Sequence, residues 1–277
     1  MDFRAKPASE YPIPELVDVL NRGFEGYFVP IAFNVTAFLT MIRKDGLDLT
    51  SSRVLLADEQ PAGIALIARR GWTSRLAAMG IASETRGKGA GLWLMEHIIQ
   101  EACDRGEKEM LLEVIEQNTP AVRLYEKCGF EVIRRLVGLI RKDATEVQTD
   151  ELAQIDIREA SRLIIQYGLP DLPWQLSGES IAQINPPSRA YQKGQAYAVI
   201  SNPDVQDVVV WSLLVEPERR GNDLGVDMLK TLIANHPGKT WHVPAILPEE
   251  VANVYEQAGF EREELSQWQM RRMLESV

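Results

Sequence analysis

A glycine-rich turn with two basic residues is the stretch of this sequence whose composition best suits the binding of an anion. Arg86-Gly-Lys-Gly-Ala-Gly91 follows an apolar run and precedes Leu92–Ile99, where apolar residues recur with the period of a helix. At the start of a helix, free backbone N–H groups and the helix dipole attract negative charge. Glycine lets the backbone approach a ligand closely, and Arg86 and Lys88 add positive charge. The turn predicts a diphosphate site, and an ordinary strand-to-helix turn is the alternative interpretation.

The spacing within the turn excludes two other phosphate-binding loops, and a second motif narrows the chemistry. The G-x-G-x-x-G pattern of dinucleotide-binding folds is absent, and no Gly-Lys-Ser/Thr of a Walker A loop follows. Further along the chain, the apolar strand Met110–Ile115 precedes Asn118 and a helix over 120–127, which ends before Gly129-Phe130. Two ordered motifs at this separation are more specific than either one alone.

Together, the two motifs resemble the GNAT family of acetyl-CoA-dependent N-acetyltransferases. Arg86–Gly91 looks like the R/Q-x-x-G-x-G/A loop of that family, and Leu112–Phe130 looks like its second signature. The spacing is especially similar to that of the bacterial ribosomal-protein N-terminal acetyltransferases. The resemblance covers about residues 1–142 and implies acetyl-CoA as the cofactor.

The resemblance also implies which residues hold the coenzyme. The backbone of Ile81–Ser83 would bind the pantetheine arm, and a backbone N–H near Ile81 would stabilise the oxyanion. The amides of 86–91 would hold the diphosphate, and Asn118 would bind the end of the pantetheine. The implied cofactor-binding residues are Ile81, Ala82, Ser83, Arg86, Gly87, Lys88, Gly89, Ala90, Gly91 and Asn118.

Two residues are the implied catalytic groups. Tyr125 would be the general acid, because a phenol with its ordinary pKa of about 10 carries at neutral pH the proton that a leaving thiolate needs. Glu113 would be the base, or would order water near the amine. For Tyr125 the alternative is a helix tyrosine packed on the sheet, and for Glu113 it is a place on the solvent face of its strand. Without a Ser-His-Asp or Cys-His arrangement in the sequence, direct transfer is favoured over an acyl-enzyme.

An aromatic loop is the candidate substrate site. Residues 24–30 follow the first predicted helix and carry Phe24, Tyr27 and Phe28. By the resemblance, this loop forms part of the acceptor wall, where aromatic rings offer an apolar or cation–π surface to an amine. The alternative is a loop folded over the core.

Composition sets limits on the class of protein. The chain has 277 residues, a formal charge of −10 and a pI of about 5.0, which argues against broad nucleic-acid binding. Two cysteines and three scattered histidines predict neither a disulfide framework nor a metal site. No apolar run reaches the ~18 residues of a membrane span, and the N-terminus lacks a signal-peptide pattern. A cytoplasmic protein with no membrane partner is therefore expected.

The predicted elements of the first half follow the order β-α-α-β-β-β-α-β-α-β, with the last strand over 132–140. A weakened copy follows: Trp211–Gly225 aligns with the stretch around Met79–Gly91 at an offset of 134 residues, and Val251–Phe260 aligns with Ala121–Phe130 at an offset of 130. The predicted fold class is mixed α/β (α+β), as two tandem GNAT folds, each with a central, mostly antiparallel sheet flanked by helices. The expected division is a catalytic domain over 1–142, a linker over 143–156 and a degenerate second domain over 157–277.

The second copy lacks several of the residues that the first motifs supply. Asp223 replaces Gly89, and a carboxylate 4 Å from a phosphate charge costs roughly 1–4 kcal/mol depending on the local dielectric. Val243 replaces Glu113 and Pro248 replaces Asn118, whereas Tyr255 is kept. We therefore expect a structural or substrate-shaping role for this half. Both sites would be active if Asp223 pointed away and its neighbouring amides stayed free.

Two functions of different classes remain open at this stage. The first is an N-acetyltransferase that transfers acetyl directly to a primary amine through the N-terminal half. The second is a non-catalytic protein that binds acyl-CoA as a sensor or scaffold. The sequence leaves open whether the acceptor is a small amine or a peptide N-terminus, and whether the tandem chain replaces a homodimer or forms one.

Overall fold

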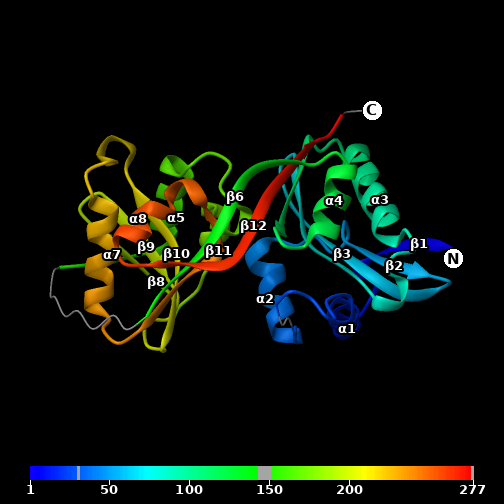
Figure 1. Ribbon diagram of the computed structural model, residues 1–277, viewed down its shortest axis with the longest axis horizontal. Helices are drawn as coiled ribbons and strands as arrows, with labels where there is room; N and C mark the ends of the chain where they lie inside the picture. The colour runs from blue at the N-terminus through cyan, green and yellow to red at the C-terminus, as the bar shows by residue number, and fades with distance from the viewer. Residues whose placement is uncertain (30–31, 143–150, 276–277) are drawn as a thin grey trace. The chain divides into compact units, whose positions relative to one another are not determined.

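The computed structural model describes residues 1–29, 32–142 and 151–275, and divides the chain into two compact units. Unit 1 comprises Met1–Ile133 and Trp268–Val277, and unit 2 comprises Arg134–Gln267 (Figure 1). The end of the predicted aromatic loop, at Pro30, lies outside the described residues, as do residues 143–150 of the linker predicted over 143–156.

Unit 1 is a mostly antiparallel sheet with helices on both faces. Its strands run in the order β1-β2-β3-β4-β5-β12, and β4 and β5 are parallel, whereas the other printed pairs, β1–β2, β2–β3 and β3–β4, are antiparallel. In Figure 1, α3 and α4 lie on one face and α1 on the other. The elements are β1 (Phe3–Pro7), α1 (Ile13–Gly23), α2 (Val35–Asp45), β2 (Arg53–Ala57), β3 (Gln60–Arg70), β4 (Thr73–Ile81), α3 (Ala90–Asp104), β5 (Glu109–Ile115), α4 (Thr119–Lys127) and β12 (Glu261–Met273), whose last residues belong to this unit.

Unit 2 has the same architecture, with shorter elements in its N-terminal part. Its strands run in the order β6-β11-β10-β9-β8-β7, with β10 and β11 parallel and the other pairs antiparallel. The elements are β6 (Glu131–Arg141), β7 (Ala153–Ile155), α5 (Ile157–Tyr167), α6 (Gly178–Ile181), β8 (Arg189–Lys193), β9 (Ala196–Ile200), β10 (Asp207–Val215), α7 (Leu224–Asn235), β11 (Thr240–Pro248) and α8 (Ala252–Gln257). The predicted mixed α/β class and the tandem architecture are confirmed. No helix in the described ranges is long and apolar enough to cross a membrane, and the cytoplasmic location stays a prediction.

The observed units differ from the expected division at residue 142. Most of β6 belongs to unit 2, and the end of β12 belongs to unit 1. The strand predicted over 132–140 forms as β6, but its residues from Arg134 onward belong to unit 2, where they pair with β11. In unit 1, the amide of Leu274, just after β12, donates to the Lys108 carbonyl at 2.8 Å, and Met270 packs in the core. β7 lies within the linker predicted over 143–156, and α5, which follows it, was not predicted.

Each exchanged strand carries, in its last two residues, an arginine that binds the C-terminal end of a helix. Arg272 of β12 donates to the carbonyl of Cys128 after α4, and Arg141 of β6 donates to the carbonyl of Ala258 after α8. Helix C-termini leave carbonyls without helical partners, and a guanidinium satisfies them. The same kind of hydrogen bond, from an arginine to a carbonyl after a helix, therefore anchors both exchanged strands.

A β-bulge in β4 decides which side chains face which helices. The register with β3 shifts between Leu66 and Ile67, so that Ala77 has no partner. Without the bulge, the strict alternation of a strand would put Leu76 and Met79 on opposite faces. With it, both pack against the core formed with α3 and α4. Unit 2 repeats the bulge at Trp211 of β10, 134 residues later.

The bulge also turns Gly80 toward α1, where two backbones meet without side chains between them. A Cβ built on Gly80 would lie 2.9 Å from the Cα of Gly23, the last residue of α1, and a Cβ on Gly23 would lie 2.7 Å from Gly80 backbone atoms. Real Cβ atoms do not approach backbone so closely, so both positions require glycine. This contact fixes the end of α1 against the strand that leads into the glycine-rich turn.

We expect Gly80→Ala to lower the free energy of unfolding by about 1–3 kcal/mol, because the added methyl group must push α1 away from β4. Denaturant unfolding measures the change. Asp18→Ala is the matched control, since Asp18 is exposed on the same helix, and its effect should stay within about 0.5 kcal/mol. Equal stability of Gly80→Ala and the wild type would contradict the close packing of α1 on β4.

Candidate functional site

The glycine-rich turn presents free amides at the start of α3. Gly87 and Gly89 adopt positive φ angles of 74° and 85°, and Gly89 caps the helix without any side-chain cap. In the ranges that the structure describes, no acceptor contacts the amides of Gly87, Lys88 or Gly89. A Cβ at Gly89 would meet no protein atom within 4 Å. The turn can therefore accommodate an anion against its backbone.

Arg86 binds backbone carbonyls of the protein, although its charge suggested a role in binding the diphosphate. Its guanidinium donates to the carbonyl of Ile81 at 2.8 Å and to those of Gly23 and Glu25 at 3.0 Å each. Its amide donates to the Ser83 carbonyl at 3.3 Å. Arg86 thus ties the turn to the ends of β4 and α1, and Lys88, which is exposed, is the residue of the turn with an uncommitted cation.

The edge of β4 becomes free where β5 leaves it. The parallel register of the two strands ends at Leu76 and Leu112, while β4 continues to Ile81. The Ala82 amide donates to the Ala62 carbonyl on the β3 side. Because successive residues of a strand point their backbone groups to alternate edges, those of Ile81 point toward the opposite edge. Of the predicted stretch Ile81–Ser83, the backbone of Ile81 is therefore the part that faces this gap.

Three residues from distant parts of unit 1 influence one another. The Asn118 side chain lowers the pKa of Tyr27, and Tyr27 raises the pKa of Tyr125, so the three side chains lie near one another. Asn118 also caps α4, through a bond from the Ala121 amide. The structure thus brings together Tyr27 from the predicted acceptor wall, Asn118 from the predicted coenzyme site and Tyr125, the predicted acid.

The two tyrosines keep their protons. Burial raises the pKa of Tyr125, and the nearby Tyr27 and Cys128 raise it further. Burial also raises the pKa of Tyr27, and the bond from Asn118 partly offsets that rise. Tyr125 packs its ring edge-on against Phe130 at 6.0 Å between centroids, as the packing alternative predicted, yet its hydroxyl has no hydrogen-bond partner in the described chain. A buried, protonated phenol without a partner can donate a proton.

The aromatic loop forms a row of rings. Phe24 and Tyr27 are 5.0 Å apart between centroids, and Tyr27 and Phe28 are 5.7 Å apart, both edge-on. Phe24 and Tyr27 are partly buried, whereas Phe28 is 53% exposed. The loop is therefore packed at one end and open at the other, and the row can line a binding surface near Tyr125.

Glu113 is neither a free base nor a solvent-facing residue. Its Oε2 accepts bonds of 2.7 Å from both Nε and Nη2 of Arg75, and the two side chains are 3% and 4% exposed. The predicted solvent-face alternative is therefore wrong. Glu113 Oε1 and Arg75 Nη1 have no partners in the described residues. The free carboxylate oxygen can still accept a bond from water or an amine.

Arg75 is the site residue that sequence reasoning missed. It precedes the apolar run Leu76–Met79, and a lone charge inside a buried strand needs an opposite charge nearby. That signal was present in the sequence, but it did not identify the partner, which lies 38 residues away on β5.

Unit 2 retains the backbone of this site and changes its side chains. Gly221 and Asp223 have positive φ angles of 80° and 55°, as Gly87 and Gly89 do, and α7 also begins without a side-chain cap. Arg220 donates to the carbonyls of Val215 and Tyr167, as Arg86 does to Ile81 and Gly23. The positions of Arg75 and Glu113 are taken by Val209 and Val243, so the buried ion pair has no counterpart there.

Comparison with known proteins agrees with this geometry. Residues 15–130 match the family model described as "Acetyltransferase (GNAT) family". This stretch of unit 1 is similar to that family. A streptothricin acetyltransferase from Streptomyces lavendulae is 38% identical over 76 residues, which are 27% of this chain and 40% of that protein. The chain thus spans less than half the length of the curated relatives it matches.

Solved structures extend the likeness to the whole chain. A GCN5-related N-acetyltransferase from Sphaerobacter thermophilus superposes with a TM-score of 0.70 at 15% identity, over 98% of this chain and 96% of the other. A tandem GNAT protein from the clavulanic acid biosynthesis pathway superposes with a TM-score of 0.63 at 14% identity, over 100% and 99%. At these identities the likeness shows the fold alone, which is a GNAT fold in tandem.

We expect Arg75→Met to lower the stability of the GNAT domain by about 3–5 kcal/mol, because it leaves the Glu113 carboxylate buried without a counter-charge. Adding Glu113→Leu should restore most of the loss, since apolar groups of similar volume can replace a buried pair. Thermal and denaturant unfolding measure both variants.

Arg22→Met serves as the control for loss of an ion pair, because Arg22 and Glu84 pair at 2.6 Å with side chains 49% and 59% exposed. Its cost should stay below about 1 kcal/mol. A double variant as unstable as Arg75→Met alone would show that the charge of Glu113 is not what the arginine compensates.

Proposed function

We propose that unit 1 is an acetyl-CoA-dependent N-acetyltransferase that transfers the acetyl group directly to a primary amine. The single observation that best supports this is that the free edge of β4, beyond Leu76, leads into the free amides at the start of α3. The match to the GNAT family model supports the reaction class, and the streptothricin acetyltransferase likeness supports a small-molecule amine as acceptor. A peptide N-terminus is the other acceptor that the sequence left open.

The residues of the turn fit the coenzyme. The free amides of Gly87, Lys88 and Gly89 can bind the diphosphate at the positive end of α3, and Lys88 can add its charge. Ala90 and Gly91 begin the helix behind them. The outward backbone of Ile81 can pair with an extended amide chain, as one strand pairs with another. Bound here, the coenzyme supplies an acetyl thioester.

The chain's own groups then serve three needs of amide formation from a thioester. A backbone N–H near Ile81 can stabilise the negative charge that develops on the thioester oxygen. Tyr125 can protonate the departing thiolate, since its hydroxyl is protonated and has no protein partner. Glu113 Oε1 can order a water that removes the proton from the amine. Because Oε2 is held by Arg75, we assign Glu113 this ordering role in preference to direct proton transfer.

Tyr125→Phe should lower the turnover number at least tenfold while the Michaelis constant for acetyl-CoA changes little. The reason is that the phenol acts on the leaving group and not on coenzyme binding. The measurement is release of free thiol from acetyl-CoA with a panel of amines. Because burial raises the pKa of Tyr125, wild-type turnover should not fall as pH rises toward about 10, the value of an ordinary phenol.

Tyr255→Phe, the same change in unit 2, is the matched control and should leave turnover unchanged. If coenzyme binds tightly and no amine in the panel reacts, the acyl-CoA sensor becomes the better interpretation. Unchanged turnover in Tyr125→Phe would remove Tyr125 from the mechanism.

Gly89→Asp should abolish coenzyme binding to unit 1, because it places a carboxylate where the diphosphate approaches and copies the residue of unit 2. Asp223 shows that the positive φ angle of this position tolerates aspartate, so the fold should survive. Calorimetric titration with coenzyme A measures the loss, and Gly89→Asn is the uncharged control, which should retain most of the affinity. Unchanged affinity in Gly89→Asp would place the diphosphate elsewhere.

A further inference from the structure

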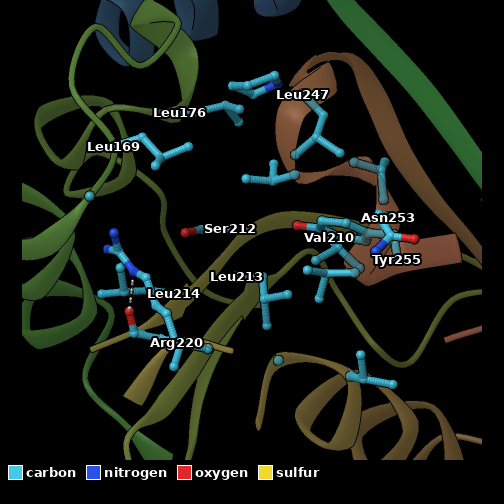
Figure 2. A pocket seen from close by; sticks show the side chains of 18 of the residues that line it. Leu169, Leu176, Val210, Ser212, Leu213, Leu214, Arg220, Leu247, Asn253 and Tyr255 are labelled. Carbon is cyan, nitrogen blue, oxygen red and sulfur yellow. Dashed lines mark hydrogen bonds between the residues drawn. The ribbon is translucent and has the colours of Figure 1, made fainter. Parts of the chain in front are cut away.

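Unit 2 contains a cavity of about 390 Å³ at the place where its own parallel strands part. The register of β10 and β11 ends at Val209 and His242, and the cavity lies beyond this point (Figure 2). Its walls come from β10, β11, α8, the start of α7 and the segment after α5. Its volume falls in the range of small-molecule sites, ~300–1,000 Å³.

The lining is largely aliphatic, with Trp211, two hydroxyls and the amide side chains of Asn253 and Gln257 among it. Leu169, Leu176, Leu213 and Leu247 surround the space in Figure 2. Val243 stands where unit 1 has Glu113, so the wall from β11 carries no charge at this position. A ligand that fills this space must therefore have a largely apolar body.

Two hydroxyls offer polar contacts inside this lining. Tyr255 is 3% exposed and lies on the cavity wall, and in the described ranges its hydroxyl has no hydrogen-bond partner. The Ser212 hydroxyl, on the opposite wall, also has none there. Each hydroxyl can donate and accept hydrogen bonds, so a ligand with one amide or hydroxyl group can bond to them.

The mouth of the cavity does not favour a phosphorylated ligand. Asp223 lies on the lining at the start of α7, where its carboxylate opposes an incoming phosphate. The Arg220 guanidinium is committed to backbone carbonyls, as the dashed line in Figure 2 shows for one of them. Arg219 is left as an exposed cation near the rim, and one cation beside one carboxylate does not make a diphosphate site.

We propose that the cavity of unit 2 binds an uncharged, largely aliphatic molecule with one hydrogen-bonding group, and excludes phosphorylated coenzymes. The aliphatic walls hold the body of the ligand, and Tyr255 and Ser212 hold its polar group. Asp223 is the specificity-determining residue at the entrance. This site is separate from the one proposed in unit 1.

Octanamide is the probe, titrated into the full chain by calorimetry with and without saturating coenzyme A. We expect one octanamide per chain, with an affinity that coenzyme A does not change. Ser212→Phe fills the cavity and should weaken octanamide binding at least tenfold while the affinity for coenzyme A stays within twofold. Tyr255→Phe, which changes little volume, should weaken octanamide binding about fivefold, the loss of about one hydrogen bond.

Val205→Phe is the control, since Val205 is 46% exposed in unit 2 and outside the cavity lining, and it should bind octanamide as the wild type does. Three results would overturn the proposal: no binding of octanamide, competition between octanamide and coenzyme A, or a second equivalent of coenzyme A that Ser212→Phe removes. Octanamide binding with no coenzyme binding at all would instead count against the function proposed for unit 1.

Discussion

The separation of two parallel strands is the constraint on which both units depend. In unit 1, β4 and β5 pair over Thr73–Leu76 and then part, and in unit 2, β10 and β11 part after Val209. A strand edge without a partner exposes amides and carbonyls that need hydrogen bonds. The bulge just before the opening sets the faces of the strand, and the helix that follows presents its free amides at the far end. The parting of the two strands thus leaves a gap with unpaired backbone groups along one strand and anion-attracting amides at the start of the helix.

The two units show how the same gap can be given different chemistry by few side chains. In unit 1, the buried pair of Arg75 and Glu113 lies near the opening, and Gly89 leaves the helix start uncovered. In unit 2, valines replace the pair, Asp223 occupies the helix start, and an aliphatic cavity results. The parts that only shape the backbone are retained in both: the bulge, the positive φ angles and the arginine bound to the carbonyl at the strand end.

Local patterns in the sequence predicted most elements, because period and capping residues act within a few positions. Asn34 or Thr36 and Gly46 predict the two ends of a helix, which forms over Val35–Asp45 with Asn34 as its cap. Two apolar runs around Asp58-Glu-Gln-Pro61 predict a hairpin, which forms from β2 and β3. The partner of Glu113, the task of Arg86 and the exchange of β6 with β12 could not be predicted in this way. Each depends on contacts between residues 38 to 144 positions apart, for which a single sequence carries no local signal.

The exchange of strands has a consequence for the order in which the chain folds during synthesis. The sheet of unit 1 includes the end of β12, and its core includes Met270 and Leu274. A ribosome releases these residues only after it has made all of unit 2. The sheet of unit 1 therefore stays incomplete at β5 until the end of β12 has been made. Unit 2, whose sheet includes β6, can complete its own sheet at the same time or earlier. Covalent continuity through β12 therefore makes the completion of unit 1 depend on the prior synthesis of unit 2.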